Sequence, residues 1–325
     1  MRFIVYGVGA IGGTIAASLA LAGHDVIGIA RGKMLAAINA NGLLFRSPEG
    51  EHRVSFPCFA GPDGIDFRPD DVILLAMKSQ DTEAALLALR AAGVTDQAVI
   101  CAQNGVANER MALRLFENVY GMTVMIPADY TVPGEVNCYG GPKLGVFDLG
   151  RYPKGSDSVA EAIAEHLRAA NFAVFVLDDV MRSKHGKLLS NLNNVLEAAL
   201  GPKTDRKAFV AKAQAEAEAV YRAAGIEWNA VGPGADDPRR KGLMEMRPVA
   251  GALRFGGSST QSLQRGTPSI ETDYLNGEIV LLGRLHGVPT PVNRYLAALG
   301  QRLIAERLEP GAVSRDEVAA ALGQS

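Results

Sequence analysis

Residues 2–13 read RFIVYGVGAIGG, and this stretch decides the fold of the first half of the chain. A short apolar run leads into a G-x-G-x-x-G pattern at Gly7, Gly9 and Gly12, and an alanine-rich helical segment, Thr14 to Ala22, follows. In such a loop the first glycine permits the turn, the second lets a pyrophosphate approach the backbone, and the third lets the helix pack on the strand. The free N–H groups of the helix N-terminus then face the phosphates. The predicted dinucleotide-binding loop consists of Gly7, Val8, Gly9, Ala10, Ile11 and Gly12.

Strand and helix signals continue to alternate after this loop. Strands are predicted at 26–30, 71–77, 98–102 and 172–177, with a helix at 82–92 between two of them. Between Val119 and Gly150, short runs rich in β-formers are broken by Gly and Pro, which indicates hairpins or edge strands. The alternation predicts an α/β domain over residues 1–178, a Rossmann-like, doubly wound parallel sheet covered by helices.

The second half of the chain reads as helical. Apolar residues recur with helical spacing over Ser183–Leu200, Lys207–Ala224 and Ser269–His286, whereas Ala230–Lys241 is rich in Gly, Pro and Asp and is predicted to be a loop. We therefore expect a second, all-helical domain over residues 179–325.

Composition excludes several classes of protein. The chain has 325 residues, 48% of them apolar, and a net charge of -2 without a concentrated basic segment, so two globular domains are expected and nucleic acid is not. Charges interrupt every apolar stretch, so no membrane span is expected, and the first residues suit a buried strand better than a signal peptide. We expect a cytoplasmic protein. Its three cysteines, Cys58, Cys101 and Cys138, are expected to be buried and reduced, and its five histidines show no metal-ligand spacing.

The residues after the second strand indicate which dinucleotide binds. NAD enzymes usually place a carboxylate there, but residues 28–33 read GIARGK. Arg31 can form a bidentate contact with a 2′-phosphate, with Lys33 as a second cation, so NADP(H) is the predicted cofactor. The alternative is a solvated surface arginine.

Polar residues of the helical half suggest a second site. Lys187 and Asn191 stand four residues apart and share one helix face, and Asn194 falls near it. Glu271 and Asp273 open a later helix. Each feature also has a structural explanation, since a helical lysine is usually solvated and carboxylates favour a first helical turn.

Together these segments resemble the ketopantoate reductase (2-dehydropantoate 2-reductase) family over nearly the whole chain. The matching pieces are GVGAIG at the start, Arg31, Lys78 in LLAMKSQDTEAAL, Asn104 in AQNGV, Lys187 with Asn191, and Ser259 with Glu271. The resemblance implies an NADPH-binding N-terminal domain and a C-terminal domain like that of 6-phosphogluconate dehydrogenase, which closes over a small 2-oxo acid. A homodimer is one assembly it allows.

The resemblance also assigns roles to residues. Lys187 would be the general acid, and Glu271 would hold the hydroxyl-bearing end of the substrate and orient Lys187. Asn104, Asn191 and Ser259 would bind substrate, with Asn104 and Lys78 also at the cofactor. An ammonium suits this chemistry because hydride transfer to a ketone leaves charge on the oxygen. The expected enzyme is an NADP-dependent oxidoreductase that reduces 2-dehydropantoate to pantoate for pantothenate and coenzyme A biosynthesis.

Three departures from the family pattern keep other functions open. His185 stands where an aromatic residue is usual, Val195 replaces a second asparagine, and residues 260–266 (TQSLQRG) lack an acidic residue. Because a moved or lost buried amide changes which acid fits, a paralogous reductase of another small 2-oxo acid is the main alternative. A non-catalytic NADPH-binding regulator, or a dehydrogenase that shares only the first domain, are the others.

Overall fold

The chain forms two compact units in the computed structural model, which describes residues 1–231, 237–254 and 256–323. The first, here called the sheet unit, comprises Met1–Lys184 and Ala230–Arg254. The second, the helical unit, comprises His185–Asn229 and Phe255–Ser325. The predicted fold class, a Rossmann-like α/β domain followed by a helical domain, is confirmed.

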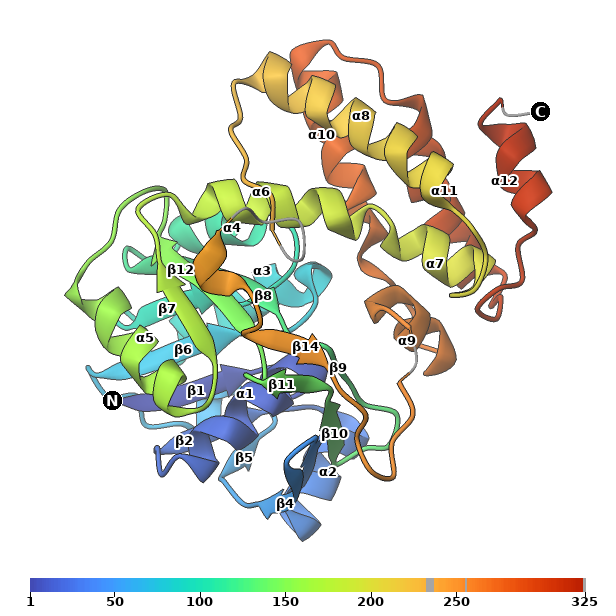
Figure 1. The fold of residues 1–325 in the computed structure, drawn as a ribbon. Helices are drawn as coiled ribbons and strands as arrows, with labels where there is room; N and C mark the ends of the chain where they lie inside the picture. Colours follow the sequence, from blue (N-terminus) through green and yellow to red (C-terminus); the bar gives the residue numbers. More distant parts are fainter. Residues whose placement is uncertain (232–236, 255, 324–325) are drawn as a thin grey trace. The chain divides into compact units, whose positions relative to one another are not determined.

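The sheet unit is built on eight strands in the order β13-β12-β8-β7-β6-β1-β2-β5 (Figure 1). They are β1 (Arg2–Tyr6), β2 (Val26–Ile29), β5 (Cys58–Phe59), β6 (Asp71–Leu75), β7 (Ala98–Cys101), β8 (Val119–Met125), β12 (Val146–Arg151) and β13 (Ala173–Val176). Neighbouring strands run parallel except β8 and β12, which pair antiparallel. Since β2 and β6 flank β1, the chain reverses its direction of winding at β1, where α/β sheets bind ligands.

Helices cover both faces of this sheet. They are α1 (Ala10–Leu21), α2 (Gly32–Asn41), α3 (Thr82–Ala91), α4 (Asn108–Leu113) and α5 (Ser158–Ala169). Phe3 and Val5 of β1 face a core shared with α1 and α5, whereas Ile4 faces the opposite core with α3 and α4. This alternation produces the predicted doubly wound arrangement.

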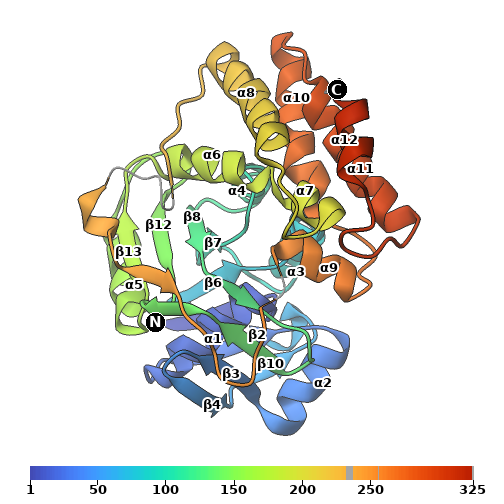
Figure 2. The same cartoon turned by 45° about the vertical axis from the view of Figure 1, so that its right-hand side comes forward.

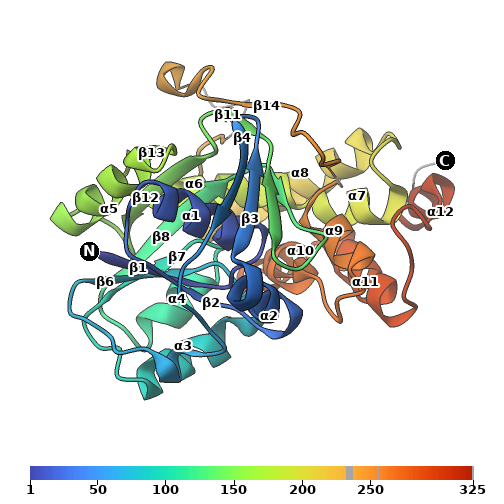
Figure 3. The same cartoon turned by 90° about the horizontal axis from the view of Figure 1, so that it is seen from below.

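Two small sheets accompany the large one. The first has the order β4-β3-β10-β9, and Figure 3 shows β3 and β4 side by side. Its strands are β3 (Leu43–Ser47), β4 (Gly50–Val54), β9 (Ala128–Asp129) and β10 (Glu135–Cys138). The second pairs β11 (Gly140–Pro142) with β14 (Met244–Met246). The β3–β4 hairpin was not predicted, and β8, expected in a hairpin or edge region, is an inner strand of the main sheet.

The segment predicted as a loop after the second helical stretch belongs to the sheet unit. Its described part contains a 3-10 turn, η4 (Pro238–Arg240), and β14 follows it. Arg240 lies 2.5 Å from the buried Asp148 carboxylate and over the Phe175 ring. Residues 232–236 of the predicted loop lie outside the described residues.

The helical unit contains the end of α6 and six further helices, which include the adjacent pair α8 and α10 (Figure 2). They are α6 (Val180–Asn191), α7 (Asn194–Leu200), α8 (Lys207–Ala224), α9 (Ser258–Gln264), α10 (Asn276–His286), α11 (Pro291–Ala305) and α12 (Arg315–Ala321), with a 3-10 turn η5 (Glu271–Tyr274) before α10. Among the described residues, no helix is both long and apolar enough to cross a membrane.

Three helix predictions need correction. The first helix begins at Ala10, four residues before the predicted Thr14, so that Gly12 lies within it. The stretch 183–200 is not one helix, because the N–H of Asn193 bonds the carbonyl of Ser190, three residues back, and α6 ends there. The stretch from Ser269 starts as the 3-10 turn, and its α-helix begins only at Asn276. The three cysteines are buried and free, as predicted.

Candidate active site

The glycine loop after β1 has open space beside its backbone at Gly9. Gly7 has φ +104°, and a Cβ at Gly12 would lie 2.1 Å from the Gly7 carbonyl oxygen, so both glycines are needed for the turn and for the packing of α1. A Cβ at Gly9 would meet only Tyr130 Cε1, at 3.6 Å. Gly9 is the N-cap of α1 and no side chain caps that end. The fold therefore tolerates a side chain at Gly9, and the open space there fits a pyrophosphate at the helix N-terminus.

Other predicted cofactor residues lie at the same edge of the sheet, where β1, β2, β6 and β7 end. Lys78 follows β6 and precedes the 3-10 turn η2 (Ser79–Asp81), and Asn104 follows β7. Ser79 Oγ and Asn108 Nδ2 both donate to the Asn104 carbonyl, at 3.4 and 3.1 Å. These bonds join the two loops and hold Lys78 and Asn104 at one edge.

Arg31 also lies at this edge, directly after β2. Its guanidinium forms an ion pair of 2.9 Å with Asp81, at the end of η2, and the two side chains are 71% and 39% exposed. Sequence reasoning missed Asp81 because it looked for a carboxylate after β2 alone. Here the carboxylate comes from the loop after β6, which only the strand order brings close.

The helical unit presents Lys187 and Asn191 one turn apart on α6. Lys187 is half-buried, and burial lowers the pKa of its ammonium. Asn191 is buried, and its Nδ2 has no hydrogen-bond partner within the described part of the chain. Since buried polar groups are nearly always paired, an orphan amide beside such a lysine fits a ligand site.

Glu271 is buried at the start of η5. Asn276, the first residue of α10, donates through Nδ2 to the Leu192 carbonyl at 3.4 Å and to Asn293 Oδ1 at 3.1 Å. This buried amide pair fixes the η5–α10 junction against the residue that follows Asn191. The segments carrying Glu271 and Asn191 are thus brought together by side chains.

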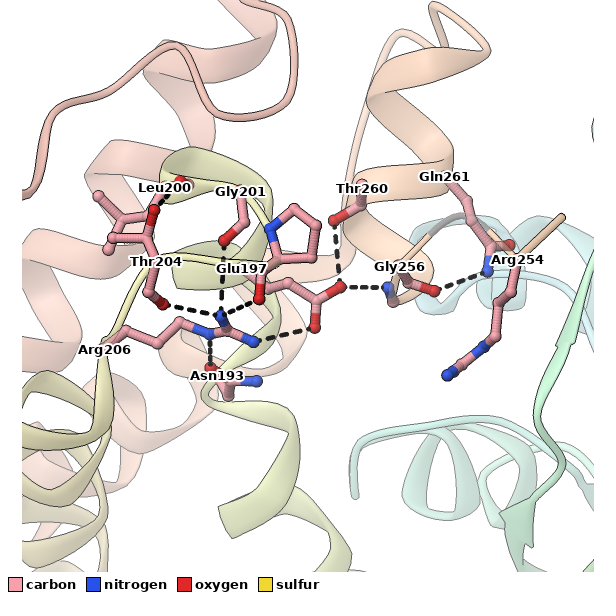
Figure 4. A network of polar contacts seen from close by, with 12 residues as sticks. Asn193, Glu197, Leu200, Gly201, Thr204, Arg206, Arg254, Gly256, Thr260 and Gln261 are labelled. Atoms are coloured by element: carbon pink, nitrogen blue, oxygen red, sulfur yellow. Dashed lines mark hydrogen bonds and ion pairs between the residues drawn. The ribbon is translucent and has the colours of Figure 1, made fainter. Parts of the chain in front are cut away.

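A separate polar network centres on Glu197 of α7 and reaches the start of α9, the helix that contains Ser259 (Figure 4). Ser259 lies buried in the first turn of α9, two residues after Gly257, whose N–H donates to the Glu197 carboxylate of α7. Thr260 Oγ1 lies 3.5 Å and Arg206 Nη2 3.3 Å from the same carboxylate. The network therefore holds the α9 N-terminus against α7. Sequence reasoning missed Glu197 and Arg206, because a helical Glu and a loop Arg look like solvated residues.

The first turn of α6 belongs to the sheet unit and is fixed there by Lys184. This fully buried ammonium forms an ion pair with Glu109 of α4, and donates to the carbonyls of Gln103 and Cys101 at 3.0 and 3.3 Å. The first turn of α6 is thereby attached to the end of β7. Removal of one partner from such a buried pair would leave an uncompensated charge.

The comparisons with known proteins agree with this arrangement. The model described as "Ketopantoate reductase PanE/ApbA" matches residues 3–153, and its C-terminal counterpart matches residues 179–303. A 2-dehydropantoate 2-reductase of Pyrococcus horikoshii is 28% identical over 309 residues, which cover 92% of this chain and 96% of that protein. One from Mesorhizobium japonicum is 29% identical, over 94% of this chain and 99% of that protein.

Solved structures share the fold over nearly the whole chain. A PanE/ApbA family ketopantoate reductase from Ralstonia eutropha is 27% identical with a TM-score of 0.76, over 94% of this chain and 99% of that one. A D-mandelate dehydrogenase, solved with NADH and anilino(oxo)acetate, is 23% identical with a TM-score of 0.76 over the same shares, a likeness of fold alone. The two matched models, the full-length relatives and the shared fold establish that this chain belongs to the ketopantoate reductase family of oxidoreductases.

Proposed function

We propose that the chain is an NADPH-dependent reductase that converts 2-dehydropantoate to pantoate, for pantothenate and coenzyme A biosynthesis. The observation that carries the proposal is the pair on α6, Lys187 with its lowered pKa and Asn191 with its unpaired buried Nδ2. Relatives that align over their full length are named 2-dehydropantoate 2-reductase, which supports the same substrate.

The sheet unit supplies the cofactor site in this proposal. Backbone N–H groups at the start of α1 and the open face of Gly9 would hold the pyrophosphate, and Arg31 would bind the 2′-phosphate. Lys78 and Asn104 would line the same edge. When bound, the nicotinamide supplies the hydride that reduces the 2-oxo carbon.

The helical unit supplies the proton donor. As the substrate's carbonyl oxygen gains charge, the Lys187 ammonium stabilises it and releases its proton, which a lowered pKa makes easier. The free Nδ2 of Asn191 would donate to the acid, and Ser259 would add a hydroxyl. Glu271 would accept from the substrate's own hydroxyl group and orient Lys187. A regulator that binds NADPH without turnover would not need a proton donor such as Lys187.

One observation favours a second candidate, a reductase of a more apolar 2-oxo acid. Val195, which stands where the family pattern has an asparagine, is fully buried on α7. His185 keeps an aromatic contact, with its ring centroid 5.1 Å from that of Tyr221, so that departure is conservative. The valine is therefore the departure most able to change the substrate.

The test is NADPH oxidation with a panel of 2-oxo acids that includes 2-dehydropantoate, 2-oxoisovalerate and phenylglyoxylate. We expect the largest kcat/KM with 2-dehydropantoate. A larger value with an acid that lacks the hydroxyl would select the second candidate. NADPH binding without oxidation by any acid would select the regulator.

A further inference from the structure

The cofactor edge of the sheet unit carries a positive and a negative side chain at one point. Arg31 follows β2, Asp81 closes η2 after β6, and their guanidinium and carboxylate lie 2.9 Å apart. Tyr6, the last residue of the intervening strand β1, is near both. Burial raises the pKa of its phenol. The positive charge of Arg31 acts against this shift, and the negative charge of Asp81 adds to it.

The position of Asp81 is fixed by its surroundings. Its backbone N–H donates to the Lys78 carbonyl at 2.9 Å. The next residue, Thr82, is fully buried and bonds Asn108 Oδ1 at 2.8 Å, while Gln103 Nε2 donates to Thr82 Oγ1 at 2.7 Å. The backbone that carries Asp81 is therefore fixed at this edge, and its carboxylate pairs with Arg31, whose side chain is the more exposed of the two.

This edge therefore carries both groups that proteins use to recognise the adenosine ribose, a carboxylate and an arginine. A carboxylate accepts hydrogen bonds from the ribose hydroxyls of NAD(H), and an arginine binds the 2′-phosphate of NADP(H). A 2′-phosphate must share Arg31 with Asp81, and it carries the same sign of charge as that carboxylate. A 2′-hydroxyl meets neither difficulty, because it can donate to Asp81.

We propose that Asp81 is a specificity-determining residue, which competes with the 2′-phosphate of NADPH for Arg31 and accepts a hydrogen bond from the 2′-hydroxyl of NADH. The preference of the chain for NADPH over NADH is then smaller than it would be with Arg31 and no carboxylate beside it. This inference rests on the proposed function, because it assumes a dinucleotide at the glycine loop.

The experiment is a fluorescence titration of NADPH and NADH against the full chain and three variants, Asp81→Asn, Arg31→Ala and the double variant. In Asp81→Asn, the ratio of the NADH to the NADPH dissociation constant should rise by about three- to tenfold, since an exposed ion pair and one nearby like charge are removed. NADPH should bind more tightly and NADH more weakly. An unchanged ratio, or weaker NADPH binding, would overturn the role of Asp81.

The double variant separates competition from general repulsion. If Asp81 acts through Arg31, Asp81→Asn should tighten NADPH binding clearly less once Arg31 is alanine, because only the like-charge repulsion is then removed. An equal gain in both backgrounds would overturn the competition. Glu218→Gln is the matched control, because it neutralises a similarly exposed partner of an arginine, Arg222, on α8. Binding of neither dinucleotide to the unmodified chain would instead show that the cofactor assignment has failed, and the inference with it.

Discussion

The glycine edge of the sheet unit and the polar cluster of the helical unit differ in how they are built. At the edge, the predicted pyrophosphate contact is one loop of consecutive residues, and Gly7 and Gly12 allow no side chain without a clash. In the cluster, α6, α9 and η5 each contribute one or two groups, and buried polar bonds from Glu197 and Asn276 hold them in place. A local motif therefore determines the first site, and long-range side-chain contacts determine the second.

Because the two sites are built differently, we expect variants to affect them differently. Cofactor binding should respond to changes in backbone shape, whereas substrate binding and protonation should respond to changes in charge and hydrogen bonding. Variants in either unit should accordingly affect different measured constants.

Lys187→Ala should give the largest effect. Loss of a general acid lowers kcat by about 100- to 10,000-fold, while the NADPH dissociation constant should stay unchanged because Lys187 lies in the helical unit. In the unmodified chain, kcat should fall as pH rises through a lysine pKa below the ordinary 10.5, and this limb should vanish in the variant. Steady-state kinetics across pH, with the exposed Lys203→Ala as control, measure both. A kcat within a few fold of normal would mean that Lys187 donates no proton.

Gly9→Ala should give the next largest effect, on cofactor binding. Its Cβ has ordinary space within the fold but would intrude where the pyrophosphate approaches, so NADPH should bind about tenfold more weakly or worse at unchanged thermal stability. Gly12→Ala, by contrast, should lower the free energy of unfolding by about 1–3 kcal/mol, because its Cβ meets the Gly7 carbonyl. Melting curves and NADPH titrations compare the two. Normal NADPH affinity in Gly9→Ala would remove the glycine loop from the site.

Glu197→Gln should give a smaller, mixed effect. It removes the charge that binds Arg206 and the Gly257 N–H, so the free energy of unfolding should fall by about 1–2 kcal/mol. The KM for the 2-oxo acid should rise by about three- to tenfold as Ser259 loses its support. Urea unfolding and kinetics test both, with Glu218→Gln as the exposed control. Lower stability at an unchanged KM would show that the network does not position the substrate site.

The smallest effect concerns pH and His166 of α5. Burial, then the charge of His24 and that of the N-terminus, lower the pKa of His166, so the folded state prefers its neutral form. This contribution to stability is present above pH 6.5 and is lost as pH falls through the lowered pKa. In His166→Gln, urea unfolding at about pH 7.5 and about pH 5.5 should show a smaller loss of stability on acidification. The exposed His286→Gln should behave like the unmodified chain, and an equal loss in His166→Gln would contradict the assignment.

Much of the fold could be predicted from periodicity. The start of β1 and both ends of α8 fall where the pattern placed them, because each element carries a clear apolar spacing. The β3–β4 hairpin could not be read from alternation, because its second strand, residues 50–54, is exposed and polar. The turn residues Pro48 and Gly50 were the available signal.

The candidate site likewise has parts that could be predicted from the sequence and parts that could not. The glycine loop and the Lys187–Asn191 pair could be read from spacing, because their members share one loop or one helix face. Asp81 and Glu197 could not, since their partners lie far along the chain and only the strand order or the helix packing brings them together. The roles assigned to Lys187, Glu271, Asn191 and Ser259 stay predictions.

Asn191→Leu tests most directly whether the helical unit keeps polar groups unpaired for its substrate. Leucine has a similar volume and removes the buried Nδ2 that has no partner among the described residues, so the free energy of unfolding should stay the same or rise. The kcat/KM for the 2-oxo acid should fall about 10- to 100-fold, because a hydrogen bond to a charged group contributes about 1.5–3 kcal/mol. A clear loss of stability with normal kcat/KM would contradict this account and make Asn191 a structural residue.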